Sequence, residues 1–181
     1  MANGAMTTNV KEEKEVRQKL VDEGYIDCIV QLPEKLFFTT GIPCCLFFLS
    51  KNRDGKNGYR ARKNEILFID ARKMGTLVSR KQKALSKEEI DKIAAVYRAY
   101  KYEGVEGYKD VVGFCKVATI DEVRANDYKL TPGIYVGTEV SNEDDVPFEE
   151  KMAELTQRLL EQFEESNRLQ EQIKKDLEGL V

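Results

Sequence analysis

The sequence predicts an α/β fold that is followed by a long helical extension. Short apolar segments, such as residues 25–32 and 65–71, alternate with segments whose apolar residues recur at helical spacing. The composition then changes at residue 138, where an acidic stretch precedes a long amphipathic segment. With 181 residues, of which 41% are hydrophobic and 34% charged, the chain is long enough to bury a core.

The first elements are a helix and two strands. Residues 10–24 predict a helix that ends at Gly24, since glycine is the usual residue just after a helix. A buried strand follows at residues 25–32. Residues 42–50 are apolar on both faces, so we expect that strand to be central or covered on both sides. Residues 1–9 lack the apolar stretch of a signal peptide, and they predict a leader that is disordered or foreign to the natural chain.

Two further strands lie on either side of a helix. The segment 51–63 carries six basic residues and one aspartate, and its glycines indicate a flexible surface connection between strands. Residues 65–71 predict the third strand, and residues 110–118 predict a fourth, shorter one. Strands of this kind without a nucleotide-binding loop suggest half of a domain, with an exposed sheet edge.

Two capping boxes mark the starts of helices. Ser86 with Glu89 opens an amphipathic helix that reaches Tyr102, and Thr119 with Glu122 opens a short one. In such a box, the hydroxyl and the carboxylate satisfy backbone N–H groups that the first helical turn leaves free. Together with the strands, these helices predict an α/β domain that extends from residue 10 to residue 137.

The end of the chain predicts an acidic linker at residues 138–146 and one long helix over residues 147–181, with Pro147 at its first position. Its apolar residues recur at steps of mostly three and four. A lone helix cannot hide such a stripe, so we expect it to pack on another protein, on a second copy or on its own domain. The stripe comprises Phe148, Met152, Leu155, Leu159, Phe163, Leu169, Ile173 and Leu177.

The composition excludes several classes of site. The chain contains no histidine, which excludes Ser-His-Asp and Cys-His catalysis and predicts no metal site. Its four cysteines lack Cys-x-x-Cys spacing and lie in or beside apolar runs, which indicates buried thiols in a reducing cytoplasm. No apolar run approaches the roughly 20 residues that span a bilayer. No Gly-x-Gly-x-x-Gly motif follows a strand, so the usual dinucleotide cradle is not visible.

Five stretches, taken together and in order, resemble the carboxy-terminal part of the modification subunit of type I restriction–modification systems. These subunits are S-adenosylmethionine-dependent N6-adenine DNA methyltransferases. The stretches are "VRQKLVDEGYIDCIVQLPEKLFFTTGIPCCLFFLSK", "EILFIDARKMG", "RKQKALSKEEIDKIAAVYRAY", "GFCKVATIDEVRANDYKLTPGIYVG" and "VPFEEKMAELTQRLLEQFEESNRLQEQIKKDL". The resemblance implies the carboxy-terminal half of a Rossmann-like methyltransferase sheet with an antiparallel strand pair.

The resemblance also implies what this chain lacks. In the family, the glycine-rich cofactor loop and the Asn-Pro-Pro-Phe motif lie upstream of the part that this chain resembles. S-adenosylmethionine is therefore expected in the intact enzyme and not on this fragment, which should not methylate DNA alone. No catalytic residue is assigned within the chain.

The segment that follows "LP" resembles the family's late motif beside the pocket for the flipped base. The resemblance implies that Phe37 stacks on the extruded adenine, with Phe38 as the alternative, because a flipped base needs a new aromatic neighbour. Thr40 and Gly41 would let the backbone pass close to the base, and Pro43 would begin the antiparallel strand. The residues alone leave another interpretation open, in which both phenylalanines fill the interior of a hairpin.

A basic segment and the long helix complete the predicted surfaces. Arg80, Lys81 and Lys83 precede the capped helix and suit contact with DNA phosphates, although a solvated surface turn is the alternative. The resemblance implies assembly with the specificity and restriction subunits of a type I complex, with the apolar stripe docking the specificity subunit. The alternative function is a non-enzymatic module that binds a partner or itself through the helix and touches DNA without specificity.

Overall fold

The computed structural model describes residues 1–104, 107–138 and 148–178, and side chains of the long helix from 150 to 177. The chain divides into two compact units, Met1–Glu139 and Val140–Val181. The first unit contains η1 (Asn3–Met6), α1 (Lys11–Asp22), β1 (Ile26–Gln31), β2 (Cys45–Leu49), β3 (Glu65–Asp70), β4 (Thr76–Ser79), β5 (Gln82–Ala84), α2 (Lys87–Lys101), β6 (Cys115–Thr119), α3 (Ile120–Ala125) and α4 (Pro132–Tyr135). The second contains α5 (Phe148–Glu178). The predicted linker, residues 138–146, lies almost wholly outside the described residues, as does Pro147.

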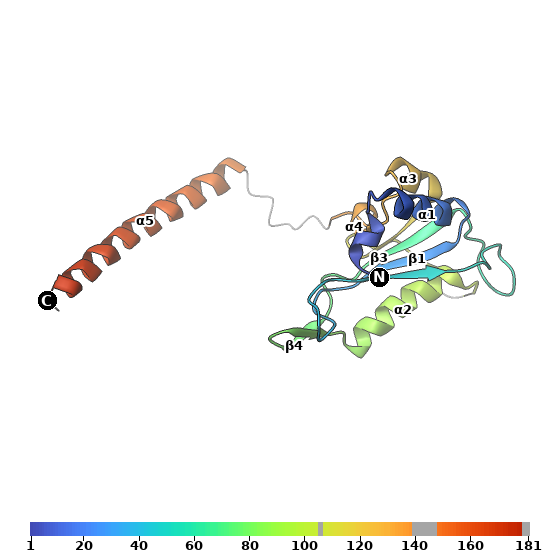
Figure 1. The fold of residues 1–181 in the computed structure, drawn as a ribbon, viewed down its shortest axis with the longest axis horizontal. Helices are drawn as coiled ribbons and strands as arrows, with labels where there is room; N and C mark the ends of the chain where they lie inside the picture. The colour runs from blue at the N-terminus through green and yellow to red at the C-terminus, as the bar shows by residue number, and fades with distance from the viewer. Residues whose placement is uncertain (105–106, 139–147, 179–181) are drawn as a thin grey trace. The chain divides into compact units, whose positions relative to one another are not determined.

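A four-stranded sheet in the order β2-β1-β3-β6 forms the centre of the first unit. The two inner strands, β1 and β3, are parallel, with Ile29 opposite Phe68 and Gln31 opposite Asp70. The outer strands, β2 and β6, are both antiparallel to their neighbours. Helices α1 and α3 lie on one face of the sheet and α2 on the other (Figure 1). This arrangement confirms the predicted α/β class, including an antiparallel pair and a helical extension.

The sheet has a hydrophobic layer on each face because the inner strands are apolar on both sides. On the α1 face, Val21, Ile29 and Phe68 are buried, and the ring of Tyr135 stacks on Phe68 with centroids 4.0 Å apart. On the α2 face, Leu67 and Tyr100 belong to the second buried cluster. The apolar alternation along β1 and β3 thus anchors helices from distant parts of the sequence.

The predicted helix boundaries are confirmed in their geometry. Both capping boxes are complete, with Ser86 Oγ accepting from the N–H of Glu89 and Thr119 Oγ1 accepting from that of Glu122. Gly24 follows α1 with φ of +68°, a conformation that costs glycine little and most other residues much more. The boxes fix where α2 and α3 begin, and therefore where they meet the sheet.

The second strand was expected to be central or covered on both sides, and it is not central. Among the described strands, only β1 pairs with β2, and Leu46 and Leu49 are exposed. Its two faces are nevertheless partly covered, because Phe47 packs against the α1-face core and Phe48 against the α2-face core. The apolar run on both faces indicated a covered strand because hydrophobicity reports burial and cannot tell which element supplies it. The sheet edge that the missing nucleotide loop suggested lies at this strand, and Met1 and Ala2 pair with its first part.

The amino-terminal residues contact the sheet, where the sequence predicted a leader that is disordered or foreign to the natural chain. Met6 is buried against the α1-face core, and Asn3–Met6 form a 3₁₀ turn. The amino group of Met1 donates to the carbonyl of Cys45, and the N–H of Cys45 donates to the carbonyl of Met1, both at 2.9 Å. The buried side chain of Met6 and the backbone groups of Cys45 that point away from β1 hold this segment in place.

The cysteines behave largely as expected from their apolar surroundings. All four are free thiols; Cys28, Cys45 and Cys115 are buried, and Cys44 is partly exposed. Burial raises the pKa of the Cys28, Cys45 and Cys115 thiols, because the charged thiolate would lose its hydration. They therefore act as small apolar core residues.

Candidate functional site

The carboxyl ends of the parallel strands bring the predicted site residues to one edge of the sheet. β1 ends at Gln31 and β3 at Asp70, and these residues are direct neighbours in the register. The loop 32–44 follows the first strand, and the hairpin β4–β5 follows the second. Ligands of α/β sheets bind outside the carboxyl ends of the strands, so this edge is the candidate site.

The loop after β1 presents two phenylalanines to solvent. A bridge pairs Phe37 with Thr40, and Thr40 Oγ1 accepts a hydrogen bond from the N–H of Ile42 at 3.2 Å. Phe37 is 51% exposed and Phe38 is 88% exposed, whereas Leu36 packs against the core on the α2 face. The interpretation in which both rings fill the hairpin interior is therefore wrong, because Leu36 takes that role.

The predicted basic segment is part of a β-hairpin that the sequence did not indicate. Arg80 and Lys81 form its exposed turn, and Lys83 lies in β5. The backbone N–H of Lys83 donates to the carbonyl of Lys35 at 2.8 Å. The structure thus joins the basic hairpin to the loop that carries Phe37 and Phe38.

The carboxylate of Glu89, at the start of α2, also holds the β4–β5 hairpin in place. Glu89 accepts from the N–H of Gly75 at 2.7 Å and from the N–H of Ser86 at 2.8 Å. These two hydrogen bonds lower the pKa of Glu89, since they stabilise its charged form. The capping box was predictable from local sequence, but the contact with Gly75 depends on the fold.

The carboxylate of Asp70 pairs with Arg72, which lies at the same end of the sheet. Arg72 donates from Nε and Nη2 to its carboxylate, with the shortest distance 2.6 Å. These bonds raise the pKa of Arg72. A Cβ on Gly133, in α4, would lie 2.8 Å from Arg72 Nη2, so glycine leaves room for the guanidinium.

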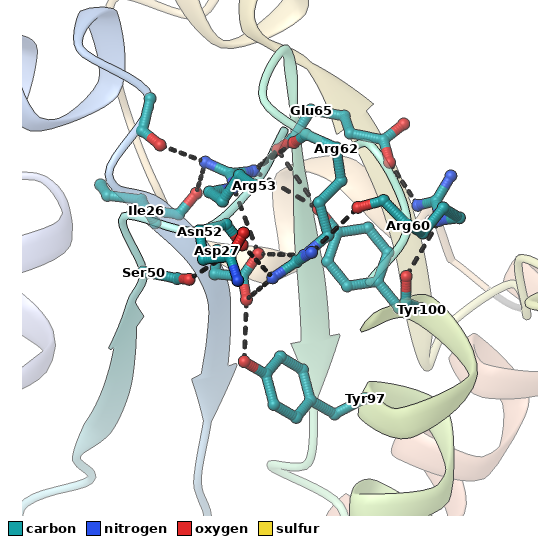
Figure 2. Close-up of polar contacts among 11 residues, drawn as sticks. Ile26, Asp27, Ser50, Asn52, Arg53, Arg60, Arg62, Glu65, Tyr97 and Tyr100 are labelled. Atoms are coloured by element: carbon teal, nitrogen blue, oxygen red, sulfur yellow. Dashed lines mark hydrogen bonds and ion pairs between the residues drawn. The ribbon is translucent and has the colours of Figure 1, made fainter. Parts of the chain in front are cut away.

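At the opposite, amino end of the same strands lies a buried ionic cluster that sequence reasoning missed (Figure 2). Asp27, Arg53 and Arg62 are each at most 2% exposed. Arg62 donates to both carboxylate oxygens of Asp27, at 2.7 and 3.2 Å, and Tyr97 Oη donates to Oδ2 at 2.8 Å. Arg53 Nε lies 3.2 Å from Asp27 Oδ1, within ion-pair distance but without hydrogen-bond geometry.

The second cation of this cluster is held mainly by backbone carbonyls. Arg53 donates to the carbonyls of Gly24 and Ile26 at 2.7 and 2.6 Å, and to those of Arg62 and Glu65. One guanidinium therefore joins the turn before β1, the basic segment 51–63 and the start of β3. This segment was predicted as a flexible connection, which is wrong for its two buried arginines. The sequence feature that could have indicated this cluster was Asp27, a single aspartate within the apolar strand predicted at residues 25–32.

The long helix is described in its own unit. Seven members of the predicted apolar stripe are between 45% and 59% exposed; they are Met152, Leu155, Leu159, Phe163, Leu169, Ile173 and Leu177. The side chain of Phe148 lies outside the described residues. No helix among the described residues is long and apolar enough to cross a membrane. Within the same residues, no cluster of three or more potential ligands could hold a metal ion.

Comparison with known protein families supplies the identity of this fold. A family model described as N-6 DNA Methylase matches residues 1–144. The chain belongs to the N-6 DNA methylase family. The match includes the whole sheet, the phenylalanine loop and the basic hairpin.

Curated relatives of this N-6 DNA methylase chain are methylase subunits of type I restriction enzymes. The HindI methylase subunit of Haemophilus influenzae is 42% identical over 180 residues, which are 99% of this chain and 39% of the relative. The MjaIX methylase subunit of Methanocaldococcus jannaschii is 37% identical over 180 residues, 99% of this chain and 31% of the relative. The chain thus spans about two fifths or less of the length of these two relatives. The predicted resemblance to type I modification subunits is confirmed.

Solved structures agree with the fold of this family. The type I methyltransferase subunit from Streptococcus thermophilus matches with a TM-score of 0.61 and 28% identity, over 74% of this chain and 25% of that one. The EcoKI M protein matches with a TM-score of 0.56 over 89% of this chain and 38% of that one. At 16% identity, the second likeness concerns the fold alone.

Proposed function

We propose that this chain forms part of the modification subunit of a type I adenine-N6 DNA methyltransferase. It supplies one wall of the pocket for the flipped target base and contacts the DNA backbone. The observation that carries this proposal is the hydrogen bond from Lys83 to Lys35. It holds two exposed phenylalanines and a basic hairpin together at the carboxyl edge of the sheet.

The chemistry of this edge suits an extruded base. A flipped adenine loses its stacking neighbours, and an aromatic ring at a loop tip can replace them. Phe37 is our first candidate for the stacking ring and Phe38 the alternative, with Thr40, Gly41 and Pro43 shaping the turn. Arg80, Lys81 and Lys83 would bind phosphates beside the base and so orient the duplex.

The described edge does not fit S-adenosylmethionine, and we assign no cofactor contact or catalytic residue to this chain. Its two parallel strands end at Gln31 and Asp70, and Arg72 already engages the Asp70 carboxylate. Neither strand is followed by a Gly-x-Gly-x-x-Gly turn. The residues that bind the methyl donor and polarise the adenine amine would belong to the remainder of an intact subunit.

The long helix α5 would dock the specificity subunit, which in turn selects the DNA sequence. Its exposed apolar stripe supports a packing role, because a solitary helix gains little from such residues in water. The restriction subunit would join the same complex, and the complex would work in the cytoplasm. The same stripe also favours the alternative function, a non-enzymatic module that associates through its helix.

Two binding measurements test these roles. For the base pocket, we would compare affinities for a duplex with one unpaired adenine and for the fully paired duplex. Loss of the stacking ring in Phe37→Ala or Phe38→Ala should reduce the preference by about 1–3 kcal/mol. Lys11→Ala is the control for Arg80→Ala, because Lys11 is an exposed cation on α1. Only Arg80→Ala should reduce the salt dependence of DNA binding. An unchanged preference in both phenylalanine variants would reject the base-pocket role.

For the helix, the chain would be co-purified with a cognate specificity subunit. Leu159→Asp and Ile173→Asp should prevent co-purification, and Glu161→Gln, on the same helix, should not. If the wild-type chain forms only homo-oligomers that the same variants disrupt, the alternative function is favoured.

A further inference from the structure

The hairpin β4–β5 is strongly basic and extends away from the sheet (Figure 1). Residues 73–85, which contain it, carry four cations and no carboxylate. None of these cations forms an ion pair within the part of the chain that the structure describes. Uncompensated charge of one sign on a projecting element suits a polyanion, and duplex DNA is the polyanion of the proposed function.

The end of this hairpin also exposes two adjacent apolar side chains. Leu77 is 61% exposed and Val78 60%, and both precede the turn at residues 80–81. At the base of the hairpin, by contrast, Met74 and Leu85 pack against the α2-face core. The core therefore covers the apolar residues at the base and leaves those near the tip in water, where their exposure costs free energy.

An irregularity in the hairpin ladder affects the same residues. Leu77 pairs with Lys83, and the next pair is Ser79 with Gln82. Val78 therefore has no partner across the two strands. A β-bulge of this kind inserts one extra residue, bends the strand and re-aims side chains, and it is frequent next to active sites. The bulge thus adds an apolar side chain near the tip of the hairpin.

The hairpin and the loop that carries the two exposed phenylalanines form one hydrogen-bonded unit. β5 pairs with β4 on one side, and on the other side the N–H of Lys83 donates to the carbonyl of Lys35 at 2.8 Å. Neighbouring strands are about 4.8 Å apart, so β4 lies roughly 10 Å from the backbone of Lys35. Phe37 follows Lys35 by two residues. The apolar tip is therefore held beside the candidate base pocket.

We propose that Leu77 and Val78 form a wedge that enters the duplex and fills the position that the extruded adenine vacates. This inference rests on the proposed function, in which the phenylalanine loop receives that adenine. Extruding a base costs pairing and stacking free energy, and apolar side chains inserted between base steps offset such a cost in proteins that kink DNA. The wedge holds the adenine outside the stack and takes no part in the methyl transfer.

The cations around the tip favour DNA over a protein partner. Arg80 and Lys81 form the turn next to the wedge, and Lys83 lies across from Leu77. In a protein interface these cations would lose their hydration, and lysine is depleted at such interfaces. On DNA, the phosphates on either side of the opened step supply the counter-charge that the hairpin lacks. The tip therefore has the chemistry of an apolar insertion flanked by phosphate contacts.

The test compares three duplexes that share one target adenine. The adenine is paired with thymine in the first, faces an abasic position in the second and faces a pyrene nucleotide in the third. Pyrene fills the space of the base pair, so it keeps the adenine outside the stack and makes a protein wedge unnecessary. The whole chain with Leu77→Thr and Val78→Thr should bind the second duplex roughly tenfold more weakly than the wild-type chain does. Its affinity for the pyrene duplex should equal that of the wild type.

Three controls separate the wedge from effects on the fold. Threonine favours strands as valine does, so the hairpin should persist, and unchanged hydrogen exchange of the Lys83 amide checks this. If that exchange accelerates, Val78→Thr alone, at the unpaired position, replaces the double variant. A chain with Leu77→Ile and Val78→Ile keeps the apolar tip and should bind all three duplexes like the wild type. Val16→Thr changes an equally exposed valine on α1 and should leave binding unchanged.

The outcomes distinguish this inference from the proposed function. If Phe37→Ala and Phe38→Ala reduce the preference for the unpaired adenine but the threonine variant does not, the wedge is overturned and the base pocket stands. If only the threonine variant reduces it, the base pocket is rejected and the wedge is supported. An equal loss on all three duplexes, or an equal loss in the isoleucine variant, would indicate a general contact and overturn the wedge. Unchanged DNA binding with lost co-purification of the specificity subunit would assign the tip to a protein interface instead.

Discussion

The two ends of the parallel strands β1 and β3 differ in which side chains they bury and which they expose. At the amino end, the charged side chains of Asp27, Arg53 and Arg62 are buried and closely bound to one another and to backbone carbonyls. At the carboxyl end, the aromatic rings of Phe37 and Phe38 are exposed to water. Burying charge and exposing large apolar rings both cost free energy unless something compensates. The amino end has its compensation within the chain, whereas the carboxyl end lacks it.

This difference indicates which end holds the fold together and which end is available to a ligand. The amino end should tolerate substitution poorly, because removing one partner leaves another charge buried. The carboxyl end should tolerate substitution well in stability and poorly in binding. Four measurements of stability sharpen or break this contrast.

The largest effect is expected for Asp27→Asn. The substitution removes the carboxylate that contacts both arginines of the cluster, Arg53 and Arg62, and it should lower the free energy of unfolding by about 3–5 kcal/mol. Urea unfolding followed by tyrosine fluorescence measures the loss. Asp121→Asn is the control, because that carboxylate is exposed in its pair with Arg124 and should shift the midpoint far less. Equal shifts would contradict the assignment of the amino end as the stabilising one.

Tyr97→Phe should have the next largest effect. It removes a 2.8 Å hydrogen bond to Asp27 but leaves the bonds from Arg62, so we expect a loss of about 1.5 kcal/mol. The loss should be smaller when Asp27→Asn is already present, because both changes act on one cluster. Additive effects in this double-mutant cycle would show that the hydroxyl acts elsewhere. Tyr59→Phe, whose described contacts are through its ring, serves as the matched control.

Lowering the pH should have a smaller effect on stability, through the carboxylates at the starts of α2 and α3. Hydrogen bonds to backbone N–H groups lower the pKa of Glu89 and Glu122 in the folded chain. A lowered folded pKa adds stability above the unfolded value, near about 4.3, and this stability is lost as pH falls through the folded pKa. Amide exchange at Gly75 should therefore accelerate, beyond its intrinsic pH dependence, as pH falls below about 4.3. Glu89→Gln should show fast exchange at neutral pH, and Asp91→Asn should not.

The smallest effect on stability is expected for Phe38→Ala. The ring is exposed, so the free energy of unfolding should stay within about 0.5 kcal/mol of the wild-type value. Phe68→Ala, in the core under Tyr135, should cost about 3–5 kcal/mol in the same urea experiment. A marked loss for Phe38→Ala would mean that the loop supports the fold, and the contrast between the two ends would fail.

The parts of the fold that depend on neighbours in sequence were predictable. The capping boxes at Ser86 and Thr119 and the ion pair of Asp70 with Arg72 involve residues at most three positions apart. The edge position of β2 and the pairing of Asp27 with Arg62 were not, because they depend on which distant segments meet. Charge counts along 51–63 indicated a solvated loop, since they cannot tell which cation turns inward.

The candidate site shows the same division. The residue types along loop 32–44 and at Arg80, Lys81 and Lys83 indicated two separate surfaces. Only the folded chain joins them, through the backbone bond between Lys83 and Lys35, which has no side-chain signature in the sequence. The hairpin itself escaped prediction because its strands are short and exposed or half-exposed, so they lack the apolar alternation that marks a strand.

The close approach of Gly133 to Arg72 carries an evolutionary consequence. Because a Cβ at position 133 would lie 2.8 Å from Arg72 Nη2, a side chain there would displace the exposed end of this flexible guanidinium, although the two positions lie 61 apart in the sequence. Alanine at 133 should therefore be tolerated, and its effect should be confined to the position of Arg72 beside Asp70. Glycine at 133 should be favoured only in lineages that keep the ion pair of Asp70 with Arg72 in this geometry.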